Sequence, residues 1–174
     1  MELYHYSFSY YLRNNREIFV QDAMGEIVFV LKQNRFLLLE LKRQFSNFVK
    51  YTYRIYHAQD KRQLFLIHGH LGRYLQINDE KEKIKIKQKR MQLIEKKQQF
   101  IIGDHFYSFE VDATRKASLQ KNDQLVATAE ISNQLQSKED YHIVVEAVDA
   151  EHAALCIVCF QNFHLASYES KLIQ

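Results

Sequence analysis

Proline is absent from this sequence, and glycine occurs only four times, at Gly25, Gly69, Gly72 and Gly103. At the usual proline content of about 5%, roughly eight prolines would be expected in a chain of 174 residues. The scarcity of both residues leaves no segment with the composition of a flexible linker or a low-complexity tail. Hydrophobic residues make up 47% of the chain and aromatic residues 13%, which is enough for a full core and argues against disorder. We therefore expect one domain over residues 1–174.

Cysteine is nearly as scarce, since the only two cysteines are Cys156 and Cys159 in the apolar run 153–160. Their Cys-x-x-Cys spacing also occurs in redox pairs, but a redox pair needs an exposed thiol of lowered pKa, usually at a helix N-terminus. We expect buried, inert thiols instead, with no disulfide framework. A zinc site is not expected either, because no second cysteine pair exists to complete the ligand set.

Long hydrophobic runs are absent too. The longest is the run 153–160, eight residues, whereas a membrane-spanning helix needs about 18. The first residues, MELYHYSFSYYLRN, show no basic region followed by an apolar one, so we expect no signal peptide. The expected location is the cytoplasm, either free or at the surface of a membrane.

Positive charge is unevenly distributed, although the net charge is only +3. Residues 1–97 hold 19 Lys and Arg against 10 Asp and Glu, whereas residues 98–174 hold 5 against 11. Residues 81–97 alone have a net charge of +6, with eight basic and two acidic side chains. A block of this kind can mark a surface that binds an acidic partner. It is a small charge for tracking a nucleic-acid backbone, so nucleic acid is not the partner we expect.

Alternation of apolar and polar residues is the commonest pattern that the chain does show. Near the N-terminus, Tyr4, Tyr6, Phe8 and Tyr10 fall on one side, as in a strand with an aromatic face. Further along, pairs of short apolar runs flank turn-forming residues, as in β-hairpins. The predicted turns lie at residues 22–25, 58–62, 103–104 and 121–123, and residues 140–148 form a further strand. Many short strands separated by tight turns indicate an antiparallel sandwich or barrel.

Residues 36–50 break this alternation, because apolar side chains recur there at helical spacing. We predict an amphipathic helix over about residues 36–48, with a pair of strands as the alternative. Lys42 and Arg43 on its polar side would resemble the charged face of a helix that lies in a membrane interface. The alternative is that this helix only packs its apolar side on the rest of the protein.

Residues 149–166 form the second exception. Asp149 is a good helix N-cap, and Glu151 suits the positive end of the helix dipole. Residues 153–160 would then be apolar on every side, which requires surroundings of protein or lipid. We predict a core helix over about residues 150–166, enclosed by the sheet, with a buried strand at residues 155–160 as the alternative.

A sheet that encloses a helix needs small residues on its inner face. Residues 124–131 provide them, because Leu125, Ala127, Ala129 and Ile131 share one face of a strand, while the polar residues Gln124, Thr128 and Glu130 point away. We predict that these four side chains face the helix.

The order of these features resembles the tubby C-terminal-like superfamily, specifically its bacterial tubby-like and LURP-one-related branch. The resemblance implies an α+β, mainly β fold: an antiparallel β-barrel of about twelve strands around a central hydrophobic C-terminal helix. Eukaryotic tubby proteins bind phosphoinositide headgroups through basic residues on the barrel surface, and phospholipid scramblases have been related to the same fold. No tubby lipid-binding position is carried over, because none can be matched residue by residue. The matching stretches are VQDAMGEIVFVLK, FIIGDHFYSFEVD, LVATAEI, DYHIVVE and AALCIVCF, over roughly residues 17–165.

Lysine and isoleucine alternate in the stretch EKIKIKQKR, residues 82–90. On a strand, Ile84 and Ile86 would face the core while the lysines line the outer face, up to a change of register near residues 88–90. A row of lysines on an outer strand prevents sheet-to-sheet association, and it can also bind an anionic surface. The candidate site residues are Lys83, Lys85, Lys87, Lys89 and Arg90, with Lys42 and Arg43 added if the two segments meet.

No pattern in the sequence indicates catalysis. His68 and His70 are the only close histidine pair, and we interpret them as residues of a turn around Gly69 because no acidic residue lies near enough to complete a metal site. Phosphate-binding glycine loops and nucleophile motifs are missing. We expect neither an enzyme nor a bound cofactor or metal. The predicted function is a binding or scaffold module that docks on anionic phospholipid, or alternatively one that recognises an acidic protein or associates with itself.

Overall fold

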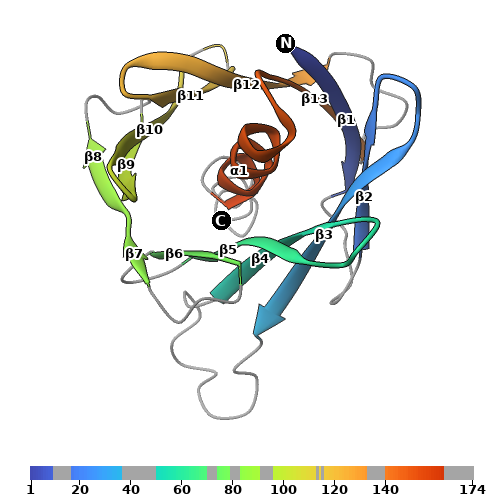
Figure 1. The fold of residues 1–174 in the computed structure, drawn as a ribbon, viewed down its shortest axis with the longest axis horizontal. Coiled ribbons are helices and arrows are strands. Elements are labelled where there is room, and N and C mark those ends of the chain that lie inside the picture. Colours follow the sequence, from blue (N-terminus) through green and yellow to red (C-terminus); the bar gives the residue numbers. More distant parts are fainter. Residues whose placement is uncertain are drawn as a thin grey trace, which may run out of the picture.

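The computed structural model describes residues 1–9, 17–36, 50–69, 74–78, 83–90, 96–112, 114, 116–132 and 140–162. These residues form one antiparallel sheet of thirteen strands that curves around a single α-helix, α1, Ala150–Phe160 (Figure 1). The predicted barrel around a central helix is therefore confirmed. The strands are β1 Glu2–Ser9, β2 Glu17–Asp22, β3 Ile27–Phe36, β4 Lys50–His57, β5 Gln63–Gly69, β6 Tyr74–Ile77, β7 Ile84–Lys85, β8 Lys87–Arg90, β9 Lys96–Ile102, β10 His105–Val111, β11 Ala117–Lys121, β12 Gln124–Ser132 and β13 Asp140–Ala147.

The sheet consists of two meanders. Strands β1 to β7 pair consecutively, as do β8 to β13, and β1 pairs with β13 to join the two halves. β7 and β8 are the two ends of the sheet, yet only Ile86 separates them in the chain. The segment 84–90 thus pairs with β6 through its first two residues and with β9 through its last four. We call residues 84–90 the closing segment, because it connects the two ends of the sheet.

The predicted hairpin turns are confirmed, and their residues explain them. Gly25 and Gly103 have φ values of +84° and +56°, a backbone conformation that side chains with a Cβ rarely adopt. Asn122 and Asp123, with φ values of +48° and +64°, form the β11–β12 turn, and both residue types tolerate this conformation. Lys121 itself is the last residue of β11, so this turn is one residue shorter than predicted.

The central helix begins where the sequence predicts. Asp149 has an extended backbone, and its carboxylate accepts a hydrogen bond from the backbone N–H of His152 at 2.8 Å. Every residue from Ala153 to Phe160 is buried, and α1 contacts β4, β5, β11, β12 and β13. The alternative of a buried strand at residues 155–160 is wrong. Residues 163–166 of the predicted helix lie outside the described residues.

Alanine on the inner face of the sheet makes room for the helix. Ala127 and Ala129 of β12 are fully buried, as predicted. The prediction for Leu125 is wrong, because its side chain is 46% exposed while Val126 is buried. The cause is a β-bulge: Leu119 pairs with Ala127, but its neighbour pairs with Leu125, so Val126 is an extra residue. The extra residue reverses which side chains face inward.

The predicted amphipathic helix over residues 36–48 lies almost wholly outside the described residues, as do Lys42 and Arg43. Phe36 is the last residue of β3 and pairs with Lys50, the first residue of β4. The helix prediction was therefore wrong for Phe36, because strand pairing with a neighbour decided its conformation. Tyr10 of the predicted aromatic stripe also lies outside the described residues, whereas Tyr4, Tyr6 and Phe8 are buried as expected.

Replacing Asp149 with alanine should lower the free energy of unfolding by about 1 kcal/mol, the usual effect of losing an N-cap. Burial alone would raise the pKa of this carboxyl, but hydrogen bonds from His152 and electrostatic attraction to that residue hold the pKa below its ordinary value. The stabilisation is thus present above about pH 4 and is lost as the pH falls through the lower, folded-state pKa. Urea denaturation at pH 7 and pH 3 measures both effects. Asp149→Asn, which keeps an N-cap, should lose less at pH 7, and an alanine variant as stable as the parent at pH 7 would contradict the assignment.

Candidate anionic-ligand site on the closing segment

The closing segment and the residue before it present lysines on the outside of the barrel. Lys83, Lys85 and Lys87 are exposed, whereas Ile84 is half-buried and Ile86 is only 6% exposed. This alternation confirms the orientation predicted for residues 83–87, since successive side chains of an extended chain point to opposite faces. Lys89 and Arg90 belong to β8, and their side chains lie outside what the structure describes. The change of register predicted at residues 88–90 is wrong for these residues, because β8 pairs with β9 in one unbroken register from Lys87 to Arg90.

The ammonium groups of this row form no ion pair within the part of the chain that the structure describes. Lys83 lies over the ring of Tyr74, with its Nζ 4.8 Å from the ring centroid. Three lysines elsewhere on the barrel are paired with glutamate: Lys32 with Glu17 at 2.7 Å, Lys97 with Glu110 at 3.3 Å and Lys116 with Glu130 at 3.4 Å. The positive charge of the row is therefore available to a ligand, while that of these other lysines is already balanced.

A pocket lies beside the closing segment because strand pairing stops short on both sides. β8 follows β9 only as far as the pair Lys87 and Gln99. β7 pairs with Tyr74 and Leu75 of β6 and goes no further. Among the described residues, the closing segment therefore forms no strand pairs with Ile77 at the end of β6 or with residues 100–102 at the end of β9. The resulting pocket has a volume of about 810 Å³ and is lined by Ile77, Ile84, Lys85, Lys87, Gln99, Phe100, Ile101, Ile102, Gly103 and Phe106.

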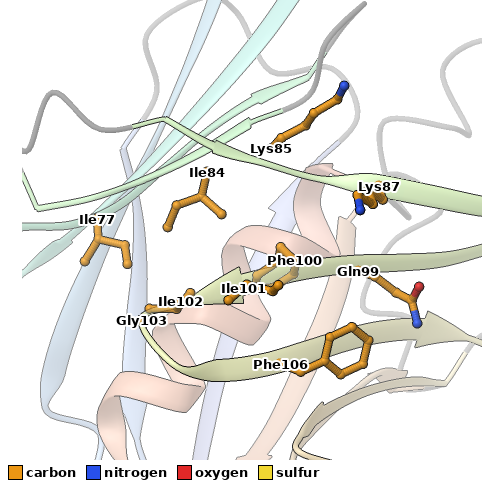
Figure 2. A pocket seen from close by; sticks show the side chains of 10 residues that line it. All are labelled: Ile77, Ile84, Lys85, Lys87, Gln99, Phe100, Ile101, Ile102, Gly103 and Phe106. Atoms are coloured by element: carbon orange, nitrogen blue, oxygen red, sulfur yellow. The ribbon is translucent and has the colours of Figure 1, made fainter.

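Figure 2 shows the lysines and the apolar side chains that line this pocket. Lys85 and Lys87 stand on the closing segment at one side, and Phe106 lies across from them. Ile101, on the outer face of β9, is 59% exposed. The sequence patterns described above do not predict this pocket. The one signal for it in the sequence is the run of three apolar residues Phe100, Ile101 and Ile102, where alternation would place a polar residue at Ile101.

The histidine pair His68 and His70, which the sequence places in a turn, is described only in part. His68 lies in β5, where the centroid of its ring is 4.4 Å from that of Tyr74, with the two rings tilted, and burial holds its pKa below the ordinary value. Gly69 also belongs to β5, so the predicted turn at this point is wrong: pairing of Gly69 with Tyr51 keeps the chain extended. His70 lies outside the described residues. Within the described ranges, no three His, Cys, Asp or Glu side chains are grouped so as to hold a metal ion.

The two cysteines are fully buried in α1, as predicted. Burial raises the pKa of the Cys156 thiol from an ordinary value of 9.0 to about 12. It also raises the pKa of Cys159, with a further contribution from Cys156. Both thiols are therefore protonated near neutral pH, the state in which a thiol is a poor nucleophile and a poor metal ligand.

Comparison with known proteins gives one match. A family model described as the Tubby C-terminal like domain matches residues 4–165. No curated protein and no solved structure matches the chain. Within the described residues, no helix has the length and apolar character needed to cross a bilayer.

Proposed function

We propose that this chain, which belongs to the tubby C-terminal-like family, binds the surface of an anionic phospholipid membrane through its row of lysines. Domains of this family bind other molecules rather than catalyse reactions, so binding is the level of function that the family supports. The choice of an anionic membrane comes from this chain's own residues. The observation that carries it is that Lys83, Lys85 and Lys87 are exposed and that their ammonium groups form no ion pair with any described residue.

The geometry of the row suits a flat, charged surface. Alternate side chains of an extended chain lie about 7 Å apart on one face, so the three ammonium groups can meet separate headgroups at the same time. Each lysine close to an acidic leaflet contributes about 1 kcal/mol of attraction. Three lysines together would then strengthen binding more than a hundredfold over a neutral membrane.

We propose that further basic residues belong to this surface. Lys89 and Arg90 follow in β8, and Lys42 and Arg43 would join it if the connection between β3 and β4 lies on the same side. In this arrangement the protein is peripheral, held on the acidic cytoplasmic face of a membrane by charge. Because exposed charges are screened over roughly 8–10 Å at physiological salt, binding should weaken as the salt concentration rises.

Flotation with phosphatidylcholine vesicles, with and without 30% phosphatidylserine, tests the proposal. The unaltered protein should bind only the acidic vesicles, and the triple variant Lys83→Glu, Lys85→Glu, Lys87→Glu should lose at least a hundredfold in affinity. A matched control places the same three charge reversals elsewhere, at Lys61, Arg62 and Lys121, and should bind more strongly than the test variant. Equal binding to neutral and acidic vesicles, or equal losses in both variants, would refute the proposal.

An acidic protein, or a second copy of this chain, is the alternative partner of the same lysines. Size-exclusion chromatography at low and high salt separates this outcome from membrane binding. The alternative is favoured if the protein does not bind acidic vesicles but associates with itself at low salt and not at high salt.

A further inference from the structure

We propose that the pocket beside the closing segment binds a single-chain anionic amphiphile, such as a free fatty acid, with its acyl chain among the isoleucines and its headgroup on Lys85 and Lys87. This inference deepens the proposed function, and it rests on it for the anion-binding role of these two lysines. It adds a defined site for one lipid molecule, which docking on a membrane by charge alone does not require.

The size and lining of the pocket fit an acyl chain. A volume of about 810 Å³ falls within the range of roughly 300–1,000 Å³ that small-molecule sites occupy. Six of the ten lining residues are apolar, namely Ile77, Ile84, Phe100, Ile101, Ile102 and Phe106. The pocket opens where the pairing of β6 with β7 and the pairing of β8 with β9 end, so an acyl chain can enter between the ends of β6 and β9 without breaking the sheet.

Apolar surface at the mouth of the pocket is left in water. Ile101 and Phe106 are direct partners across the β9–β10 pair, and they share the outer face of the sheet. Ile101 is 59% exposed and Phe106 is partly exposed. Removing such surface from water is favourable, and neighbouring exposed apolar residues often mark a binding groove. An acyl chain lying on these two side chains would cover them.

The charge of the lining decides what headgroup the ligand carries. Lys85 and Lys87 are charged, and none of the ten lining residues is acidic. A lysine stem can lie along apolar surface while its ammonium group reaches a polar headgroup. A neutral hydrocarbon would form no ion pair with these ammonium groups, and a small polar anion would leave the isoleucines exposed to water. A carboxylate on an acyl chain can pair with the lysines while the chain covers the apolar side chains.

Calorimetric titration of the full chain with octanoate, decanoate and dodecanoate, below their micelle concentrations, tests the inference. Affinity should rise about fourfold with each added methylene group, because each buries a similar apolar area. Dodecanol, which lacks the charge, should bind at least tenfold more weakly than dodecanoate. In the variant Lys85→Glu, Lys87→Glu this preference for the anion should disappear.

The matched variants Ile101→Asp and Ile27→Asp provide the decisive comparison, since both isoleucines lie in strands and are about half exposed, at 59% and 46%. Ile101→Asp should weaken dodecanoate binding at least tenfold, and Ile27→Asp should leave it unchanged. An affinity that does not depend on chain length, or equal binding by both variants, would overturn the inference.

Failure of this inference can be told apart from failure of the proposed function. If acidic vesicles bind and dodecanoate does not, the pocket is not a ligand site and the lysine surface still stands. If dodecanoate binds with the expected dependence on chain length and vesicles do not, the pocket is confirmed and membrane docking is refuted.

Discussion

Both cysteine thiols should react with a disulfide reagent at least a thousandfold more slowly in the folded protein than in denaturant. Cys156 and Cys159 are fully buried, and the pKa of Cys156 rises from 9.0 to about 12. At pH 8 this change alone lowers the fraction of reactive thiolate about a thousandfold, before the exclusion of the reagent is counted. Following the absorbance of released thionitrobenzoate, with and without 6 M guanidinium chloride, measures the ratio.

The variant Leu125→Cys supplies the control, because this position is 46% exposed on the outside of β12. Its added thiol should react rapidly while the two native thiols stay protected. Rapid reaction of the native thiols in the folded protein would mean that the sheet does not enclose α1. The free energy of unfolding should also depend on pH. Because the folded-state pKa of Cys156 lies above the ordinary value of 9.0, the thiol of the unfolded chain ionises first as the pH rises. The free energy of unfolding should therefore keep its full value below pH 9 and decrease as the pH rises further.

Replacing Phe160 with alanine should lower the free energy of unfolding by about 3–5 kcal/mol. Phe160 is fully buried at the last turn of α1, and truncating a buried aromatic side chain removes its contacts and leaves a cavity that the sheet can only partly fill. Native domains are stable by roughly 5–15 kcal/mol, so this one change would remove much of the total. Urea denaturation, followed by tyrosine fluorescence and circular dichroism, gives the difference.

Leu125→Ala is the matched control for Phe160→Ala, because it truncates a large apolar side chain on the outer face of the barrel. Its effect should stay within about 0.5 kcal/mol, as for other exposed positions. A loss below 1 kcal/mol for Phe160→Ala, or equal losses for both variants, would contradict the central place of α1. The second result would also contradict the β-bulge that turns Leu125 outward.

The helix and most of the hairpins could be predicted from sequence because local rules determine them. An aspartate cap followed by eight apolar residues has few solutions other than an enclosed helix, and α1 follows that pattern. Gly25 and Gly103 lie where the backbone needs a positive φ. In each case the deciding interaction lies within a few residues of the pattern that predicts it.

Leu125 is a position that local sequence rules predict wrongly. Alternation along residues 124–131 places this side chain inside, and only the pairing of β12 with β11 shows that Val126 takes its place. The bulge depends on two strands together, so no pattern within one of them predicts it. The turn expected at Gly69 failed for a similar reason, since pairing with β4 keeps that residue in a strand.

The candidate site shows the same difference between local patterns and strand pairing. Alternation within one segment predicts the exposed lysines of residues 83–87, and their orientation is confirmed. The pocket beside them arises from where the pairings of β6 with β7 and of β8 with β9 end, so it depends on residues from three separate stretches of sequence. The binding roles of Lys83, Lys85 and Lys87, and of Lys89, Arg90, Lys42 and Arg43, stay predictions.

The order of the strands has a consequence for the protein during its synthesis. Within the described sheet, all neighbouring strands are consecutive in the chain except β1 and β13, whose residues lie well over a hundred positions apart. On the ribosome, two curved ribbons can therefore assemble early from local contacts, but each displays a bare apolar side to the solvent. The helix that covers this apolar side, α1, leaves the exit tunnel only after all thirteen strands have been made. Until then the nascent chain is a natural client for chaperones that shield apolar surface.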